Sequence, residues 1–270
     1  MTARPQVMGV VNITPDSFSD GGRFLDPAAA IAQARRLIAE GADILDLGGE
    51  STRPGAEPVS EAEEIARVRP VIEALRADSA IPISVDTMKP AVARAAIAAG
   101  ADIWNDVTAL GWSDESLPAA AALGAPVILM HMQGDPRTMQ ADPRYDDVVS
   151  EVSAFLYRRA EAAMAAVVAR ENIRLDPGIG FGKTLAHNIE LLRNLPRLAA
   201  LGFPLVIGVS RKRFIRAIDD TAESADDRLG GSLAAALWCA QNGASIIRVH
   251  DMRETVQALE VWRAIGGGDD

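Results

Sequence analysis

The sequence predicts an α/β protein that folds as a single (β/α)8 TIM barrel, with residues 1–270 as one domain. Short runs rich in Val, Ile and Leu alternate with Ala-rich amphipathic segments from one end of the chain to the other. Eight such pairs fit within 270 residues, which is near the usual length of this barrel. The alternation is not interrupted by a segment with the composition of an interdomain linker. Together these observations favour one barrel over two ordinary domains.

The expected strands are the short apolar runs, each followed by a segment with helical periodicity. They cover residues 7–13, 43–49, 82–87, 102–107, 126–132, 173–178, 204–210 and 245–251.

Several of the intervening helices are expected to end at a glycine that directly precedes the next strand, because glycine readily adopts the left-handed conformation of a helix C-terminus. An open doubly wound sheet is the alternative architecture. It is disfavoured because no G-x-G-x-x-G turn follows the first strand. The helix-ending glycines are Gly41, Gly100, Gly124, Gly202 and Gly243.

Composition narrows the class of protein. Hydrophobic residues make up 49% of the chain, but no apolar run approaches the ~20 residues of a membrane helix. The N-terminus lacks the apolar stretch of a secretory signal, so a cytoplasmic location is expected. Cys239 is the single cysteine, which excludes an internal disulfide, and the net charge of −10 argues against nucleic-acid binding. The Gly- and Asp-rich tail from about residue 266 is expected to be disordered.

The expected strands end in polar residues. In a barrel of this type the C-terminal strand ends meet at one rim, where active sites are built. Buried polar groups cost free energy unless they are partnered, so eight such endings around one mouth indicate a ligand site. The residues at or just after the strand ends include Asn12, Glu50, Asp86, Asn105, Asp106, His131, Asp176, Ser210, Lys212, Arg248 and His250.

Each of these residues also has a plainer interpretation. Asp86 or Asp106 could cap the helix that follows. Asp176 precedes Pro177 and Gly178 and could be a turn residue. His187 falls inside an expected helix and is interpreted as an ordinary surface histidine. The prediction therefore depends on the set rather than on any one member.

The residue types at the rim restrict the chemistry. The three histidines are far apart and form no H-E-x-x-H motif, so a zinc hydrolase is disfavoured. Ser210 could belong to a Ser-His-Asp triad, but the G-x-S-x-G elbow is absent. Buried carboxylates and amides suit a flat heterocycle with N–H edges, whereas cations and an amide oxygen suit phosphate, with or without Mg²⁺. The first group is Asp86, Asn105 and Asp176, and the second is Asn12, Arg53, Lys212, Arg248 and His250.

Seven segments, in order and spread along the chain, closely resemble the dihydropteroate synthase family. The resemblance implies a TIM barrel, usually a homodimer, which joins 4-aminobenzoate to 7,8-dihydropterin-6-ylmethyl diphosphate. Diphosphate and dihydropteroate are the products, the pathway is folate synthesis, and sulfonamides compete for the aminobenzoate site. The segments are MGVVNITPDSFSDGG (8–22), GGESTRPGA (48–56), ISVDT (83–87), NDV (105–107), LDPGIGFGK (175–183), GVSRKRF (208–214) and RVHD (248–251).

The resemblance also implies roles for individual residues. The pterin would be bound by Asp86, Asn105, Asp176 and Lys212. The diphosphate would be bound by Asn12, Thr52, Arg53, Arg248 and His250, with Asn12 also a ligand of the Mg²⁺ cofactor. The aminobenzoate would be bound by Phe18, Thr52, Pro54 and Lys212, and the residues expected to act in catalysis are Asp20, Arg248, His250 and Lys212.

The implied mechanism is dissociative: diphosphate leaves first, and the arylamine captures the pterin methylene cation. Asp20 and Asp86 would face this cation. Two alternatives share the pterin-binding residues: a folate-dependent methyltransferase barrel and a non-catalytic pterin-binding paralogue. Neither needs the diphosphate-binding residues. The chain departs from the usual family pattern at Arg216, where glycine is more common, and this difference is expected to affect packing at a dimer face.

Overall fold

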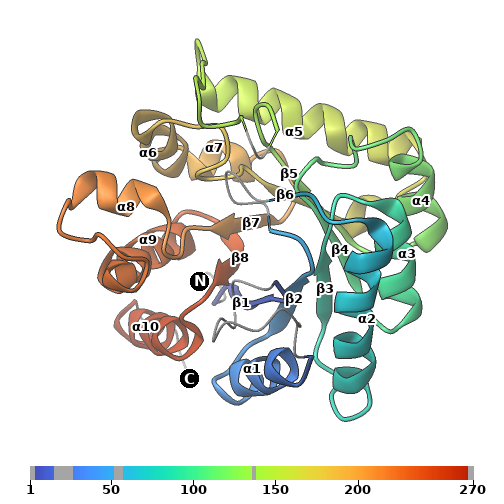
Figure 1. Ribbon diagram of the computed structural model, residues 1–270. Coiled ribbons are helices and arrows are strands. Elements are labelled where there is room, and N and C mark those ends of the chain that lie inside the picture. Colours follow the sequence, from blue (N-terminus) through green and yellow to red (C-terminus); the bar gives the residue numbers. More distant parts are fainter. Residues whose placement is uncertain (1–3, 15–26, 52–56, 136–137, 267–270) are drawn as a thin grey trace.

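The computed structural model describes residues 4–14, 27–51, 57–135 and 138–266. Eight parallel strands close into a barrel in which each strand pairs with its neighbour in sequence and β8 pairs with β1. Helices surround this barrel (Figure 1). The predicted (β/α)8 barrel is therefore confirmed.

Each expected strand overlaps one observed strand, although β1 and β8 begin one residue earlier than expected. Several are shorter than expected at their C-terminal ends: β5 and β6, for example, stop two residues early, at Met130 and Asp176. In β6 the reason is local, because Gly178 has a φ of +66°, which no strand adopts. The strands are β1 Gln6–Asn12, β2 Ile44–Gly48, β3 Ile83–Asp86, β4 Ile103–Asp106, β5 Val127–Met130, β6 Ile173–Asp176, β7 Leu205–Gly208 and β8 Ala244–Val249.

The helices follow the strands with two additions, since β6 is followed by α6 and α7, and β7 by α8 and α9. All five glycines expected to end helices have positive φ, from 60° at Gly124 to 112° at Gly100. Among the described residues, no helix combines the length and the apolar character required to cross a membrane. The helices are α1 Pro27–Ala39, α2 Glu61–Arg76, α3 Pro90–Ala98, α4 Ser116–Leu123, α5 Val148–Ala165, α6 Leu185–Arg193, α7 Leu195–Ala199, α8 Arg213–Ile218, α9 Leu229–Gln241 and α10 Met252–Ile265.

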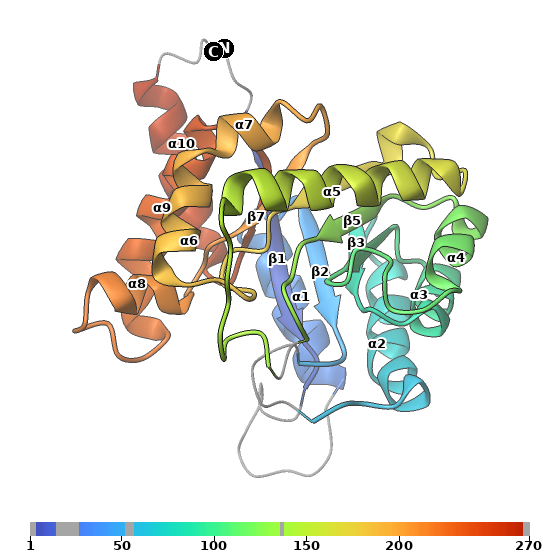
Figure 2. The same cartoon turned by 90° about the horizontal axis from the view of Figure 1, so that it is seen from above.

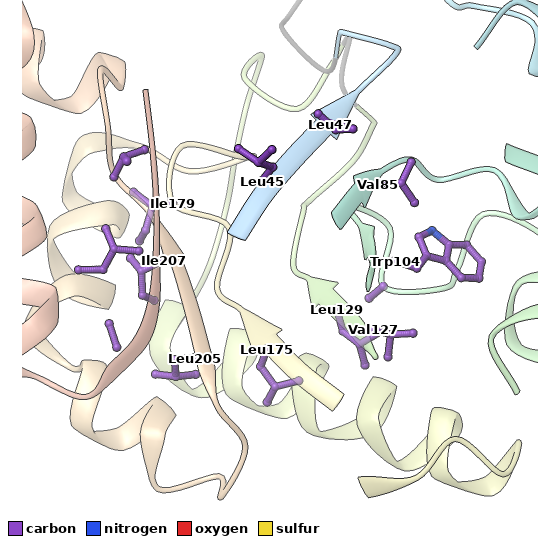
Figure 3. Packing of buried hydrophobic residues seen from close by; sticks show 14 of the residues in the cluster. Leu45, Leu47, Val85, Trp104, Val127, Leu129, Leu175, Ile179, Leu205 and Ile207 are labelled. Carbon is purple, nitrogen blue, oxygen red and sulfur yellow. The ribbon is translucent and has the colours of Figure 1, made fainter. Parts of the chain in front are cut away.

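Outward-facing strand residues form the layer between the barrel and its helices. Figure 3 shows part of this layer, with Leu45, Trp104 and Ile207 among its buried side chains. Successive side chains of a strand point to opposite faces, so the alternate residues point into the barrel. A separate buried cluster contains these inner residues: Met8, Ile44, Ile103, Ile128, Val206 and Ile246.

Two residues further along three of these strands, β2, β4 and β8, the inner face carries a polar side chain. Asp46 follows Ile44 at this spacing in β2, and Arg248 follows Ile246 in β8. On these strands the barrel interior changes from apolar to polar towards the C-terminal ends. This layering explains why buried strands end in polar groups. The last four residues of the expected disordered tail, 267–270, lie outside the described part of the chain.

Candidate active site

Arg248 of β8 links strands across the mouth of the barrel. Its Nε donates to Asp46 Oδ2 at 2.6 Å, and its Nη2 donates to Asp86 Oδ2 at 2.9 Å. Asn105 Nδ2 lies 3.3 Å from Asp46 Oδ2, which adds β4 to the network. The fold thus brings together residues separated by as many as 202 positions in sequence. Asp86, Asn105 and Arg248, all predicted from sequence, are members of this network.

In this network the carboxylates of Asp46 and Asp86 both accept from the guanidinium of Arg248. Burial, followed by the negative charge of Asp46, raises the pKa of Asp86 to about 7, although Arg248 partly opposes this shift. Burial alone would lower the pKa of Arg248, but Asp46 and Asp86 together raise it above its ordinary value. Asp86 can therefore gain or lose a proton near neutral pH, while Arg248 stays charged.

Asp176 and Lys212 are a second group of charged side chains at the rim, and each acts electrostatically on the other. Asp176 is 7% exposed at the end of β6, and its Oδ1 accepts from Gly178 N at 2.7 Å. Lys212 Nζ donates to Ile179 O and lies 4.9 Å from the centre of the Phe181 ring. Burial lowers the pKa of Lys212 to about 8, although the Asp176 carboxylate opposes this shift. Burial raises the pKa of Asp176, with Lys212 opposing.

Two glycines at strand ends leave open backbone beside these groups. A Cβ on Gly208, the last residue of β7, would lie 3.5 Å from Lys212 Nζ and 3.9 Å from Arg248 Cβ. A Cβ on Gly48 would lie 3.8 Å from both Asn12 Oδ1 and Asp86 Cβ. A methyl group at either position would therefore lie in van der Waals contact with residues of the site.

His250 directly follows β8 and is held by Ser210. The Ser210 hydroxyl accepts from His250 N at 3.2 Å and lies 3.1 Å from the ring Nδ1. In a Ser-His-Asp triad the serine pairs with Nε2, and Nδ1 faces the acid. The observed pairing through Nδ1 therefore makes Ser210 an orienting residue for the imidazole rather than a triad nucleophile. This role of Ser210 was missed in the sequence analysis.

Asp106 does not cap the helix that follows, since the N-cap of α4 is Glu115, but closes a local turn. Its Oδ1 accepts from Thr108 N at 2.7 Å and its Oδ2 accepts from Leu110 N at 2.9 Å, which closes the turn after β4. Burial raises the pKa of Asp106 to about 6, although the bonds to Thr108 oppose this shift. Asp106 is thus a turn residue of the fold rather than a ligand-facing group.

His187 lies in a helix at the surface, as expected, and has a local structural role there. The residue is half-buried in the first turn of α6, where its Nδ1 accepts from Thr184 N at 3.3 Å. Its ring also meets that of Tyr145 edge-on, at 4.9 Å between centroids. This geometry gives His187 a structural function as part of a capping box.

Asp46 was also missed, although the sequence contained a signal for it. The side chain is fully buried in a strand whose other four residues are Ile, Leu, Leu and Gly. A carboxylate at an inward position of such a strand requires a buried partner. Arg248 supplies that partner from the other end of the sequence, which spacing alone could not identify.

A buried ionic cluster holds the two ends of the second loop. Lys89 Nζ donates to Glu50 Oε2 at 3.0 Å and to Glu64 Oε2 at 2.7 Å. Glu50 Oε1 in turn accepts from Val59 N at 2.9 Å. The cluster therefore joins residues on both sides of the segment predicted to bind substrate. That segment, and the predicted part of the first loop, lie outside the described residues: Phe18, Asp20, Thr52, Arg53 and Pro54.

Comparison with known proteins identifies close relatives. Residues 8–250 match the family model described as pterin binding enzyme. A dihydropteroate synthase of Haemophilus influenzae is 48% identical over 260 residues, which cover 96% of this chain and 94% of the relative.

Solved structures are similar over the same extent. The dihydropteroate synthase of Xanthomonas albilineans with 4-aminobenzoic acid is 52% identical with a TM-score of 0.92, covering 98% of this chain and 94% of that one. The Yersinia pestis dihydropteroate synthase in a sulfonamide drug complex is 45% identical, also with a TM-score of 0.92, covering 98% of this chain and 95% of that one.

Proposed function

The chain belongs to the pterin binding enzyme family, and from this membership we propose that it is a dihydropteroate synthase. It transfers the dihydropterin-6-ylmethyl group from its diphosphate ester to the amino group of 4-aminobenzoate. The products are 7,8-dihydropteroate and diphosphate, and the pathway is folate biosynthesis. Similarity to synthases over nearly the whole chain, at about half of its positions, favours this activity over the methyltransferase barrel and the non-catalytic paralogue.

The observation that carries the proposal is the juxtaposition of two chemically different groups at one rim. Asp176 and Lys212 offer an acceptor and a donor to the edge of a heterocycle. Arg248 and His250 offer cationic or polar N–H groups to a diphosphate. Since Arg248 also bonds to Asp86, the two halves are physically joined.

In the proposed reaction the C–O bond to diphosphate breaks and its electron pair leaves on the diphosphate oxygen. Arg248 and His250 stabilise that departing charge, and Asp86, with Asp20, faces the cation that remains. The nitrogen of 4-aminobenzoate then forms the new C–N bond and releases a proton to solvent. Phe18, Thr52, Pro54 and Lys212 are proposed to hold the aminobenzoate, while Thr52 and Arg53 assist with the diphosphate.

Mg²⁺ is proposed to arrive with the diphosphate. The described residues contain no group of three or more His, Cys, Asp or Glu side chains suited to a resident metal. Asn12 offers an amide oxygen at the end of β1, which fits a cation that keeps waters and phosphate oxygens as its other ligands. When bound, Mg²⁺ would neutralise charge on the leaving group.

The Asn12→Ala variant is expected to need about tenfold more Mg²⁺ for half-maximal turnover, because one metal ligand is lost. Turnover is measured over a series of Mg²⁺ concentrations, and chelation by EDTA should abolish it in the unaltered protein. An unchanged Mg²⁺ requirement in the variant would remove Asn12 from the metal site.

A homodimer is proposed, with an apolar groove as its contact face. The groove is lined by residues of α6, α8 and α9, helices that lie next to one another on one side of the barrel (Figures 1 and 2). Ile218 and Trp238 are 63% and 46% exposed there, and exposed apolar patches of this kind favour protein contacts. Arg216, the family departure noted above, is exposed on α8 in the same region.

The Ile218→Glu variant is expected to sediment as a monomer, because the contact would bury an unpaired charge. Sedimentation velocity at several protein concentrations measures this. The proposal fails if the unaltered protein is monomeric at every concentration, or if the variant remains dimeric.

Localisation in the cytoplasm is proposed as well. Cys239, the one cysteine of the sequence, is buried as a free thiol, which suits a reducing compartment. Small-molecule substrates, rather than nucleic acid or membrane, are the proposed partners.

The enzymatic test follows dihydropteroate formation by the purified protein with Mg²⁺ and the pterin diphosphate, with and without 4-aminobenzoate. Product that requires both substrates, and that decreases when a sulfonamide is added, supports the synthase. Pterin binding without product would instead favour a non-catalytic paralogue or the methyltransferase type.

A further inference from the structure

Two loops at the rim are bonded to each other around one buried lysine. The first connects β5 to α5 through residues 131–147, and the second connects β6 to α6 through residues 177–184. Lys183, in the second loop, is 3% exposed. None of the roles derived above involves this side chain.

The Lys183 ammonium faces polar atoms from both loops. Nζ lies 2.9 Å from His131 Nδ1 and 3.3 Å from His131 O, in the first loop. It also donates to Gly178 O at 3.0 Å and Phe181 O at 2.9 Å, in its own loop. Burial lowers the pKa of Lys183 to about 7, although Asp176 opposes this shift. Hydrogen bonds from the lysine thus connect the end of β5 to the 177–184 loop.

The backbones at this connection are in direct contact. A Cβ on Gly178 would lie 1.9 Å from His131 O, and a Cβ on Gly182 would lie 2.6 Å from Gln133 O. Three carbonyl oxygens converge on the Lys183 ammonium. Without a donor at that point His131 O and Phe181 O would lose their hydrogen bonds from Lys183, whereas Gly178 O would keep the one from Phe181 N.

Further bonds hold the same loop from outside. Tyr145 Oη donates to Gly182 O at 2.8 Å, and Gln140 Nε2 donates to Gly180 O at 2.5 Å. The His131 ring packs edge-on against Phe155 at 4.8 Å between centroids. The first loop therefore acts as a support for the second.

The supported loop contacts both charged residues of the pterin half. Gly178 N donates to Asp176 Oδ1 at 2.7 Å. Ile179 O accepts from Lys212 Nζ, and the Phe181 ring lies beneath that ammonium. A shift of the loop would thus move the acceptor and the donor offered to the heterocycle at the same time.

We infer that Lys183 is a positioning residue for pterin recognition, which it serves by fixing the 177–184 loop against His131 so that Asp176 and Lys212 keep their geometry. The inference rests on the proposed function, because it names the support of that same site. It also assigns His131 a fixed form: a neutral ring that accepts at Nδ1 and carries its proton on Nε2.

The Lys183→Met variant tests this. It keeps an unbranched side chain only one atom shorter and removes the donor, so binding of the pterin diphosphate without aminobenzoate should weaken by about a hundredfold, the effect of a misplacement of about 1 Å. Calorimetric titration with Mg²⁺ present measures the affinity, and circular dichroism checks the fold.

Arg159→Met is the matched control. Arg159 is another partly buried cation that holds loop carbonyls, donating to Ala109 O and Leu110 O, each at 2.8 Å. It supports the turn after β4 rather than the 177–184 loop. Its loss should lower stability and leave pterin affinity unchanged. Equal weakening in both variants would overturn a specific role for Lys183.

Nitrogen-15 NMR of the unaltered protein provides a test without substitution. His131 should show the Nε2–H tautomer, and an Nδ1–H tautomer would overturn the inference. If the methionine variant does not fold, Lys183→Gln, which keeps amide donors, should weaken pterin binding to a smaller degree. Unchanged affinity in a folded Lys183 variant also overturns it. Failure of the unaltered protein to bind the pterin would instead contradict the proposed function.

Discussion

The Arg248→Ala variant is expected to lose turnover by about a thousandfold, the cost of removing a preorganised donor from a developing negative charge. Arg248 is held by two carboxylates, with Nε bonded to Asp46 and Nη2 to Asp86. It therefore does not need to reorganise when the diphosphate leaves. Because the interaction strengthens as charge develops, kcat should fall more than pterin affinity does. Single-turnover release of diphosphate measures the step directly.

The same substitution should destabilise the protein by about 3–5 kcal/mol, since it leaves buried carboxylates without their partner. Arg76→Ala is the control for this effect. Arg76 donates to Gly100 O at 2.9 Å and to Asp102 Oδ2 at 2.6 Å, both just before β4 and so at the opposite end of the barrel. Its loss should lower stability and leave kcat unchanged. If Arg248→Ala kept its turnover, Arg248 would have no role at the leaving group.

The rim was predictable because barrel geometry converts strand order into proximity. Asp86, Asn105 and Arg248 lie on three different strands, and closure of the barrel brings their C-terminal ends together. Only the fold class and the strand ends were needed for that prediction. The partners within the rim were not predictable, because they depend on which inward position each strand places at the same level.

Asp46 and Asp106 show this limit from opposite sides. Asp46 lies inside an apolar run and was included in a strand, whereas the structure makes it the principal partner of Arg248. Asp106 follows a strand and was a candidate for the site, but its oxygens accept from Thr108 and Leu110 in a local turn. Sequence position fixes which end of the barrel a residue occupies. Side-chain direction and local hydrogen bonding decide whether it faces the ligand.

Lys183 and His131 show a different limit. Both lie in segments that were singled out, one in a family motif and the other at a strand end. Their pairing at 2.9 Å depends on two loops packed backbone to backbone. No periodicity in the sequence encodes such a contact, because loop conformations follow from tertiary packing as much as from local residues.

Asp86→Asn is expected to lower turnover and raise stability. The amide resembles the protonated acid in shape and cannot carry the negative charge that faces the pterin cation. kcat/KM should therefore fall by about a hundredfold or more. Removal of the buried charge relieves the repulsion from Asp46 that, after burial, raises the pKa of Asp86. Arg248 keeps its bond to Asp46 in the variant, so the guanidinium is not left unpaired.

The stability gain should depend on pH in a defined direction. The pKa of Asp86 is about 7 in the folded protein against an ordinary value of 3.8. Between these values the folded state binds more protons than the unfolded state, so this group's stabilising contribution is lost as pH rises through the interval. The variant lacks that loss. The free energy of unfolding of the variant should equal that of the unaltered protein near pH ~4. Near pH ~8 it should be larger by about 2–4 kcal/mol, at 1.36 kcal/mol per pKa unit.

Urea unfolding over this pH range measures the difference, and Asp147→Asn is a control of opposite sign. Asp147 is the exposed N-cap of α5, where hydrogen bonds from Ser150 hold the pKa of its carboxyl below the ordinary value. The ionised Asp147 carboxylate therefore stabilises the folded state at neutral pH, and this stabilisation is lost on acidification. The asparagine variant should be less stable than the unaltered protein only at pH values above the titration of this carboxyl. Its turnover should be unchanged. If the stability difference between the Asp86→Asn variant and the unaltered protein did not grow with pH, burial and Asp46 would not raise the pKa of Asp86 to near 7. The carboxylate would then be an ordinary ion-pair partner of Arg248. It would not be a buried charge that lowers the stability of the protein and is retained because the reaction requires it.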